Sequence, residues 1–286
     1  MIVITGATGQ LGRLVIAALL RRGVAANHIV AAVRSPQNAT DLAGQGVIVR
    51  RADYTEPARL DSAFAGAEKV LLISGNQVGQ RVPQHQAVID AAKRAGVALL
   101  AYTSLVHATQ SPLALAAEHR ATETAIAASG LPTVILRNGW YNENFETRIT
   151  GAVATGAIHG CAGTGRFSSA SRADYAEAAA AVLTRSTSSD IQILELAGSE
   201  GYSLADLAGK VATASGKPVQ YHDLSQVEYE AALLKHGLPD AFAKILADSD
   251  AGVATGALFD EGKTLENLIG RPTTSIDETI AAILQR

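Results

Sequence analysis

Three glycines near the start of the chain, Gly6, Gly9 and Gly12, have the spacing G-x-x-G-x-x-G between an apolar run and a segment of helical periodicity. In such a motif the first glycine allows a sharp turn off a strand, and the second lets backbone N–H groups approach a pyrophosphate. The third lets the helix pack close to the sheet. Unpaired N–H groups and the helix dipole then favour a diphosphate at the helix N-terminus. The motif predicts a dinucleotide site, with a glycine-rich turn that binds no ligand as the alternative.

The next apolar run, residues 28–33, ends in Arg34. Sites for NAD usually carry Asp or Glu about 20 residues beyond the glycines, where the carboxylate binds the ribose hydroxyl. Arg34 follows Gly12 by 22 residues, and no acidic residue stands between Gly12 and Asp41. A guanidinium group can pair with the additional phosphate of NADP, which a carboxylate would repel. The sequence therefore favours NADPH, with NADH as a weaker substitute; the alternative is a solvated surface arginine.

Polar and aromatic residues follow three further expected strands. Asp53 could accept a hydrogen bond from the adenine amino group, or could cap the next helix. The Ser74–Gln77 segment is expected beside the nicotinamide ribose, unless it is only a polar turn. Trp140 and Tyr141 offer flat apolar faces with polar tips, which suit a planar ring lying on a nicotinamide. Packing of Trp140 between two lobes is the alternative interpretation.

A tyrosine with a lysine four residues later, the proton-donating pair of ordinary short-chain dehydrogenases, is absent from this chain. The equivalent helix instead carries His119 and Glu123, which share one helical face and could shuttle protons. A surface or cleft-edge pair is the favoured interpretation, because polar pairs at this spacing are common on helices. The catalytic group is therefore left unassigned, with Tyr141 and His119 as candidates, and the source of the proton stays open.

Several other classes of function lack supporting residues. The histidines have no ligand spacing and Cys161 is the one cysteine, so we expect no metal site and no internal disulfide. Ser104 does not lie in a G-x-S-x-G elbow, which argues against a hydrolase. A net charge of −3 gives no reason to expect a nucleic-acid or acidic-membrane partner.

The first residues read as a strand without a positively charged leader, and the chain has no run of 18 apolar residues. These observations predict neither a signal peptide nor a membrane-spanning helix, and hence a cytoplasmic protein.

Short apolar runs alternate with helical segments through the first half of the chain. The expected strands cover residues 1–5, 28–33, 47–53, 70–73, 98–103 and 133–137, and the expected helices 57–64, 84–95 and 115–129. Near-continuous apolar strands separated by helices predict an α/β fold with a doubly wound parallel sheet, of the Rossmann type, covered on both faces. Right-handed crossovers then bring the carboxyl ends of the strands to one rim.

The second half is less regular. We expect a loop over 151–166, a helix over 174–184 capped by Asp174, and a strand over 191–196. The remaining expected elements are helices at 204–214, 226–236, 239–247 and 276–284, and a strand at 219–222. Residues 1–140 should form the NADP-binding domain, with 171–198 returning to it. Residues 141–170 and 199–286 should form a smaller, mainly helical lobe that closes a substrate cleft.

Eight stretches that span nearly the whole chain resemble a known family. They are ITGATGQLG (4–12), VR (33–34), LIS (72–74), AYTS (101–104), LRNGWY (136–141), SRADY (171–175), ADSD (247–250) and LIGRPTT (268–274). By these stretches the chain is similar to the NmrA-like group of atypical short-chain dehydrogenases/reductases. Within that group it most resembles the bacterial NAD(P)H:quinone oxidoreductases of type 2 and, less closely, the triphenylmethane reductases.

The resemblance implies an oxidoreductase that binds NADPH and reduces a small planar quinone, and it implies residues for each part of the cofactor. The diphosphate would be held by Gly6, Ala7, Thr8, Gly9, Gln10 and Leu11, and the 2′-phosphate by Arg34. The nicotinamide half would be held by Gly75, Asn76, Gln77, Asn138, Gly139, Trp140, Tyr141 and Asn142. Arg172 is a further candidate, although its motif also leads into a helix.

Quinone chemistry agrees with the missing Tyr/Lys pair. Reduction of an alcohol-type ketone leaves a basic alkoxide, so a positioned acid contributes on the order of 10²–10⁴ in rate. Hydride addition to a quinone leaves a delocalised anion that water can protonate later. We therefore expect direct hydride transfer between stacked rings, with Trp140 and Tyr141 shaping the acceptor pocket and no obligatory side-chain acid.

Two other interpretations stay open. A non-catalytic NADP(H)-binding redox sensor that partners a regulatory protein, as in some NmrA-like proteins, would also lack the catalytic pair. A reductase of the same fold could act on triphenylmethane dyes, enones or other planar acceptors. The oligomeric state, a homodimer being one option, is likewise open.

Overall fold

The computed structural model describes residues 1–186 and 190–285, and the chain divides into two compact units. The first unit comprises Met1–Leu105, Ala117–Asn138 and Arg172–Leu194, and the second comprises Val106–Ala116, Gly139–Ser171 and Glu195–Arg286. The expected division had placed residues 106–116, 139–140, 171 and 195–198 in the first unit. Residues 187–189 and 286, which fall within the expected segments 171–198 and 199–286, lie outside the described residues.

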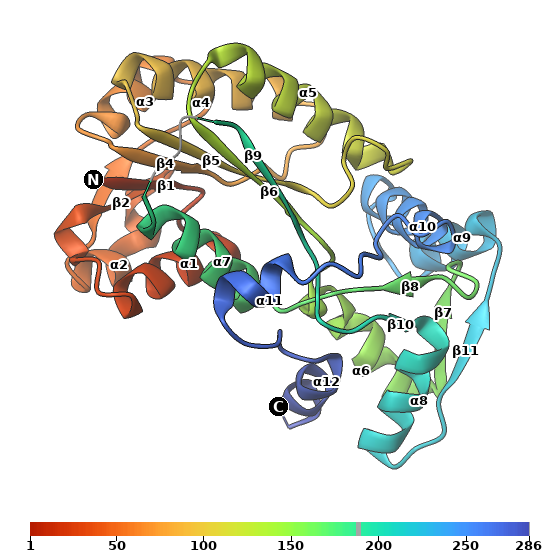
Figure 1. The fold of residues 1–286 in the computed structure, drawn as a ribbon. Helices are drawn as coiled ribbons and strands as arrows, with labels where there is room; N and C mark the ends of the chain where they lie inside the picture. The colour runs from red at the N-terminus through yellow and green to blue at the C-terminus, as the bar shows by residue number, and fades with distance from the viewer. Residues whose placement is uncertain (187–189, 286) are drawn as a thin grey trace. The chain divides into compact units, whose positions relative to one another are not determined.

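Within the described ranges, seven strands form the main sheet in the order β3-β2-β1-β4-β5-β6-β9 (Figure 1). Their bounds are β1 Ile2–Thr5, β2 Ile29–Val33, β3 Ile48–Arg51, β4 Lys69–Leu72, β5 Leu99–Leu105, β6 Thr133–Asn138 and β9 Gln192–Leu196. The pairings from β3 to β6 are parallel, with Val3 opposite Val30 and Val70. The doubly wound parallel sheet expected from the sequence is confirmed.

Helices lie on both faces of this sheet, as Figure 1 shows. One face is covered by α3 (Pro57–Phe64), α4 (Arg81–Ala95) and α5 (Ala114–Ser129), and the other by α1 (Gln10–Arg21), α2 (Thr40–Gly44) and α7 (Arg172–Thr184). Gly96 ends α4 in the left-handed conformation, with φ of 65°, which glycine adopts readily. Helix α7 begins at Arg172, so the expectation that Asp174 caps it is wrong; Asp174 lies in its first turn.

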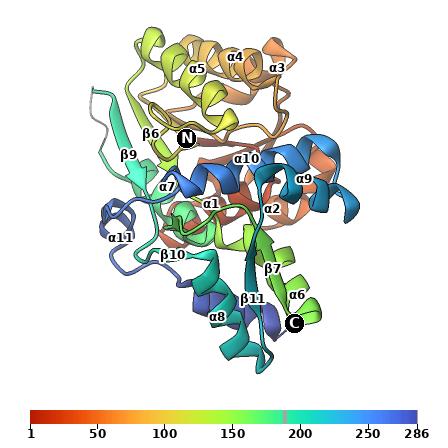
Figure 2. The same cartoon turned by 90° about the vertical axis from the view of Figure 1, so that its right-hand side faces the viewer.

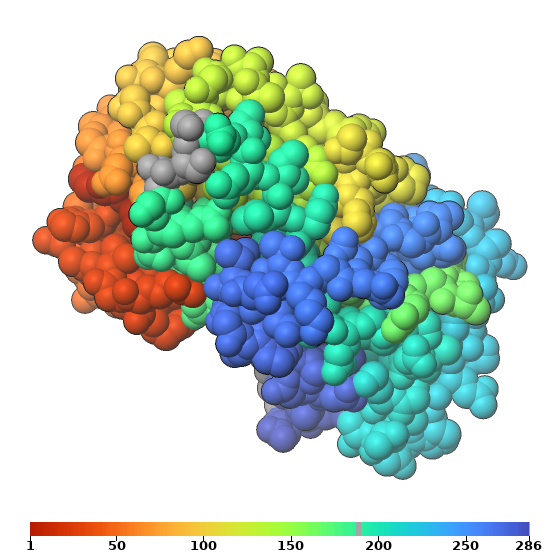
Figure 3. All heavy atoms as spheres, viewed as in Figure 1, coloured from red at the N-terminus to blue at the C-terminus, as the bar shows by residue number. Residues whose placement is uncertain are grey.

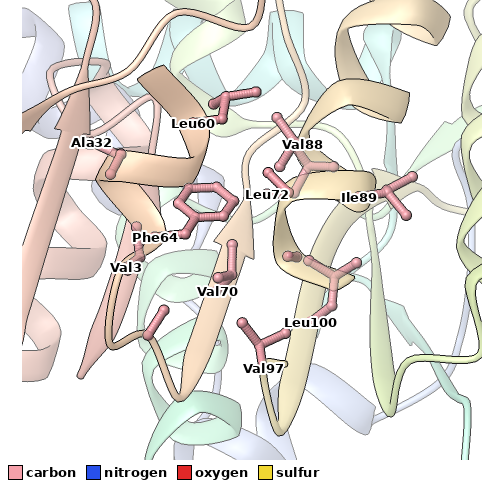
Figure 4. Close-up of a cluster of buried hydrophobic side chains, with 14 of the residues drawn as sticks. Val3, Ala32, Leu60, Phe64, Val70, Leu72, Val88, Ile89, Val97 and Leu100 are labelled. Atoms are coloured by element: carbon pink, nitrogen blue, oxygen red, sulfur yellow. The ribbon is translucent and has the colours of Figure 1, made fainter. Parts of the chain in front are cut away.

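The core of the first unit follows from alternation along the strands. Val3, Val70 and Leu72 point to one face, where they pack with Phe64 of α3 and Val88 of α4 (Figure 4). All five side chains are fully buried. The intervening strand positions are also buried, and a strand buried on both faces reads as a continuous apolar run. This is why the strands could be found from the sequence.

Strand β9 forms one edge of the sheet. Figure 3 shows this segment, in teal, at the surface of the molecule. Ile193 of β9 and the preceding Ile191 are 49% and 42% exposed.

The second unit contains two small sheets and several helices. Strand β7 (Ala157–Gly160) pairs in parallel with β11 (Gln220–Asp223), and β8 (Arg166–Phe167) pairs antiparallel with β10 (Tyr202–Ser203). The helices are α6 (Glu146–Thr155), α8 (Leu204–Ser215), α9 (Gln226–Lys235), α10 (Asp240–Ala254), α11 (Thr264–Ile269) and α12 (Ile276–Leu284). Figure 2 shows β7 and β11 side by side, with α6 and α8 next to them.

The expectation of a loop over 151–166 is wrong. This segment holds the end of α6, strand β7 and the first residue of β8. Both strands pair with segments more than thirty residues away, His159 with His222 and Phe167 with Tyr202. Because partners this distant supply the hydrogen bonds, the Gly-, Ala- and Thr-rich sequence shows no local period. Over the described ranges, no helix has the length and apolar character needed to cross a membrane.

Candidate cofactor site

The turn from β1 to α1 has the geometry that the glycine motif predicted. Gly6 has φ of 59°, the left-handed region that favours glycine, and its carbonyl accepts a hydrogen bond from Gly9 N–H at 2.9 Å. Gly9 is the N-cap of α1 without a side-chain capping bond, and the first turn contains no acidic residue. The helix therefore begins with backbone donors and a positive dipole end directed at the turn.

Gly12 lies where the helix meets that turn. A Cβ atom at this position would lie 2.5 Å from the carbonyl oxygen of Gly6 and 2.8 Å from Cα of Ala7. Since both neighbours are backbone atoms, no side-chain movement would relieve the overlap. The expectation that Gly12 permits close packing is confirmed.

A cavity of about 530 Å³ opens over the carboxyl ends of β1, β2 and β4. Its lining residues are Gly6, Thr8, Gly9, Ala32, Val33, Arg34, Ala52, Asp53, Tyr54, Thr55, Ile73, Ser74, Gly75, Asn76, Gln77 and Gln84. The structure thus brings together the glycine turn, Arg34 and the Gly75–Gln77 loop, three regions expected at different parts of one cofactor. Of the other expected residues of the turn, Ala7 and Leu11 are buried and Gln10 is exposed at the start of α1.

Arg34 is exposed at the end of β2 and makes no hydrogen bond or ion pair with any residue in the described ranges. Asp53 lies in the same cavity, and its Oδ1 accepts hydrogen bonds from the backbone N–H and hydroxyl of Thr55 at 2.9 and 2.8 Å. These bonds, with the nearby charge of Arg34, hold the pKa of Asp53 below its ordinary value. Asp53 does not cap the next helix, because α3 has Glu56 as its N-cap.

Residues 74–79 form the loop that follows β4, and side chains hold its backbone. Ser74 N–H donates to Thr103 Oγ1 at 2.9 Å, and Gly75 N–H donates to His85 Nε2 at 3.0 Å. At the far end, Gly79 N–H donates to Glu118 Oε1 at 2.8 Å. The loop is therefore anchored at both ends while Asn76 and Gln77 face the cavity and are exposed.

The expectation that His119 and Glu123 form a surface or cleft-edge pair is wrong. His119 is 6% exposed, and its Nδ1 lies 2.8 Å from the hydroxyl of Tyr102. Glu123 instead makes two bonds to Arg137, at 3.0 Å from Nε and 2.6 Å from Nη2, and accepts a hydrogen bond from Ser104. Both side chains have low exposure and bond to other residues of the first unit, and neither bonds to the other.

The expected residues after β6 are divided between the two units. Asn138 ends β6 and is buried in the first unit, whereas Gly139 to Asn142 belong to the second. Trp140 packs on Phe167 with ring centroids 6.4 Å apart, a contact within the second unit. Tyr141 pairs with Ala170 in an isolated parallel bridge.

The Asn142 side chain is fully buried in the second unit. Its amide nitrogen donates to the Thr274 carbonyl and to Thr279 Oγ1, both at 3.0 Å, and its amide oxygen accepts from Ser169. These bonds occupy both ends of the side-chain amide, and a contact between Asn142 and the cofactor stays a prediction.

Four residues that anchor the loop, directly or through His85, were not predicted from the sequence: Arg81 and His85 on α4, and Glu118 and Thr122 on α5. Each pair has the i,i+4 spacing of a helical face, so this spacing was the available signal. Among the described residues, no group of three or more His, Cys, Asp or Glu side chains could hold a metal ion.

Residues 6–186 match the family described as NAD(P)H-binding, and the chain belongs to that family. The chain is 51% identical over 281 residues to quinone oxidoreductase 2 of Escherichia coli (strain K12), covering 98% of both chains. A crystal structure of an NADPH-dependent quinone oxidoreductase from Escherichia coli, complexed with NADPH, superposes with a TM-score of 0.96 at 50% identity and covers 99% of this chain and 100% of that one.

A second solved structure is that of the Citrobacter sp. triphenylmethane reductase complexed with NADP(H). It is 38% identical, has a TM-score of 0.94, and covers 99% of this chain and 100% of that one. The resemblance to NmrA-like reductases and to type 2 quinone oxidoreductases is confirmed.

Proposed function

We propose that the protein is a reductase that transfers a hydride from NADPH to a quinone. The observation that carries this proposal is the 51% identity to an Escherichia coli quinone oxidoreductase over 98% of both chains. The cavity of the first unit supports it, since it joins a phosphate-binding turn, an arginine and a polar loop.

The residues of the cavity fit NADPH. The backbone from Gly6 to Leu11 offers N–H groups to the diphosphate, and Arg34 offers its guanidinium group to the 2′-phosphate. Gly75, Asn76 and Gln77 line the part of the cavity assigned to the nicotinamide half. NADPH, when bound, supplies the hydride. Asn138, Gly139, Trp140, Tyr141, Asn142 and Arg172 stay predicted contacts, and Trp140 and Tyr141 are the candidates that shape the acceptor pocket.

Reduction of a quinone agrees with the surroundings of His119, the candidate proton donor. His119 is 6% exposed, its Nδ1 atom is bonded to Tyr102, and it does not line the cavity of the first unit. A quinone needs no positioned acid, because the anion formed by hydride addition is delocalised and water can protonate it. The side chains then mainly have to hold two rings at about 3–3.5 Å between the reacting atoms.

The second candidate function is reduction of triphenylmethane dyes, and the 38% identity to the Citrobacter sp. reductase favours it. The non-catalytic redox sensor is the third. A cytoplasmic location and a homodimeric assembly stay predictions, to be checked by cell fractionation and by light scattering.

Absorbance of NADPH at 340 nm separates these functions. The protein should oxidise NADPH over many turnovers with benzoquinone or menadione. Turnover with triphenylmethane dyes and not with quinones would favour the second function. Tight NADPH binding without turnover on any acceptor would contradict the proposal and favour the sensor.

A further inference from the structure

The loop 74–79 has its two ends held by side chains from two different helices. Its first anchor is on α4, where His85 Nε2 accepts from Gly75 N–H at 3.0 Å and Arg81 Nε donates to the Gly75 carbonyl at 2.6 Å. Its second anchor is on α5, where Glu118 accepts from Gly79 N–H. Both polar groups of the Gly75 backbone are thus bound by α4.

The hydrogen bonds around His85 define its tautomer. A backbone N–H can only donate, so the Nε2 atom that faces Gly75 carries no proton. The other ring nitrogen, Nδ1, then holds the proton and donates it to Thr122 Oγ1 at 2.9 Å. The Thr122 hydroxyl in turn donates to the Glu118 carbonyl at 2.9 Å. Every donor in this chain of bonds has an acceptor, which leaves neutral His85 as the one form that fits.

The surroundings of His85 maintain that neutral form. The side chain is fully buried, and its ring packs edge-on against Tyr102 with centroids 5.6 Å apart. Burial, and then the charge of Arg81, lower the pKa of His85 to about 4. If His85 were protonated, its Nε2 atom would carry a hydrogen that faces the Gly75 N–H, and the hydrogen bond between Gly75 and His85 would be lost.

Gly75 does not fix the loop by its own conformation. Its φ lies outside the left-handed region, and a Cβ atom there would be 3.4 Å from Gln84 Oε1 and 3.7 Å from His85 Nε2. The position of Gly75 is therefore determined by the bonds from His85 and Arg81.

We propose that His85 is a positioning residue for cofactor binding: its Nε2 atom fixes Gly75, and thereby sets Asn76 and Gln77 for the nicotinamide half of NADPH. This inference rests on the proposed function, because it takes NADPH as the occupant of the cavity. His85 itself does not line the cavity and touches it through Gly75.

The proposal predicts that the two halves of the cofactor respond differently. The adenosine end is assigned to Gly6–Gly9 and Arg34, which are not bonded to His85. A change at His85 should therefore weaken the binding of whole NADPH and leave the binding of 2′,5′-ADP, which has no nicotinamide, unaffected.

The experiment measures dissociation constants of NADPH, by its fluorescence, and of 2′,5′-ADP, by calorimetry, for His85→Phe and His85→Gln. Phenylalanine keeps a ring but removes the acceptor, and the Gly75 N–H loses its partner. We expect Kd for NADPH to rise about tenfold, the size of effect that one lost buried hydrogen bond has. Kd for 2′,5′-ADP should stay within about twofold of its value in the parent protein.

Glutamine can place an oxygen near the position of Nε2, so His85→Gln should keep NADPH binding within about threefold of that of the parent protein.

His28, exposed immediately before β2, provides the matched control, and His28→Phe should change neither constant. Equal weakening of both ligands by His85→Phe would overturn the proposal, because it would indicate general damage to the unit. No weakening of either ligand would overturn it as well. So would a His85→Gln variant as weak as His85→Phe.

If His85→Phe does not fold, Thr122→Val gives a second test. Loss of the Thr122 hydroxyl removes the acceptor of the Nδ1 proton. The tautomer with its proton on Nε2, which cannot accept the bond from Gly75 N–H, is then no longer disfavoured. NADPH binding should weaken about threefold while the Kd for 2′,5′-ADP stays unchanged, and equal weakening of both ligands would contradict the proposal. These titrations need no quinone. A parent protein that binds NADPH without reducing quinones would contradict the proposed function, while the ratio of the two constants would still decide the role of His85.

Discussion

The hydroxyl group of Tyr102 lies 2.8 Å from Nδ1 of His119, and both side chains are buried in the first unit. Desolvation, and then the charges of Arg81 and His85, lower the pKa of His119 to about 3. Burial raises the pKa of Tyr102 above its ordinary value. Both groups are therefore neutral at physiological pH and bonded to each other.

His119→Gln should leave quinone turnover within about threefold of the parent protein, because the imidazole is neutral, nearly buried and absent from the cavity lining, and hydride addition to a quinone needs no positioned acid. Steady-state NADPH oxidation with menadione is the measurement. A positioned acid contributes on the order of 10²–10⁴ in rate, so a thousandfold loss would show that His119 acts as one. Tyr141→Phe tests the other candidate in the same assay, and there too we expect turnover to persist.

How far the site could be predicted depends on how local its determinants are. The glycine turn and Arg34 lie beside the strands that position them, and the strand-to-helix order fixes where those strands end. Asn142 is different. As a polar residue after a strand it resembles a ligand contact, but Ser169, Thr274 and Thr279 bind its amide from distant parts of the chain. Periodicity carries no information about such partners.

Arg34→Ala should raise Kd for NADPH about 10- to 100-fold and leave Kd for NADH nearly unchanged. The guanidinium group is assigned to the 2′-phosphate, and hydrogen bonds to charged groups contribute about 1.5–3 kcal/mol. Fluorescence titration with the two nucleotides is the measurement.

The control for this change is Arg59→Ala. Arg59 is an exposed arginine on α3 that pairs with Glu56 and does not line the cavity. Equal weakening of NADPH and NADH by Arg34→Ala would contradict the assignment, as would an equal effect of Arg59→Ala.

Acidification should destabilise the protein through its two buried histidines. The folded-state pKa values of His85 and His119 are about 4 and about 3, against an ordinary value of 6.5. The unfolded chain therefore binds more protons than the folded one below about pH 6.5, and stability falls as the pH falls toward 4. Between about pH 7 and pH 5 the titration of each histidine should lower the free energy of unfolding by on the order of 2 kcal/mol.

Urea unfolding at several pH values measures this loss, and His119→Gln isolates one of the two groups. The variant should show a shallower decline than the parent protein over the same range, because it lacks one titrating histidine. An identical slope in both proteins would mean that His119 is protonated, or accessible, in the folded state.

The loop anchors show a second limit of prediction from sequence. His85 and Gly75 are only ten residues apart, and the helix that carries His85 was expected. Helical periodicity indicates which residues share a face, but not which side chain turns back to bind the loop before the helix. A fully buried histidine is the observation that reveals it, and burial is known only from the fold.

Two glycine-to-alanine changes should have opposite effects on stability. At Gly12 the new methyl group would meet the backbone of Gly6 and Ala7 at 2.5 and 2.8 Å, so the turn or α1 has to shift. Overpacking of this kind costs about 1–3 kcal/mol, and the shift moves the N–H groups assigned to the diphosphate.

Gly209, exposed in α8 with open space around it, gives the matched change, since alanine favours a helix over glycine by about 0.5–1 kcal/mol. Thermal unfolding and NADPH titration should therefore show Gly12→Ala less stable and more weakly binding, and Gly209→Ala slightly more stable with unchanged binding. A Gly12→Ala variant that keeps parental stability and affinity would show that the contact between α1 and the turn is loose in solution.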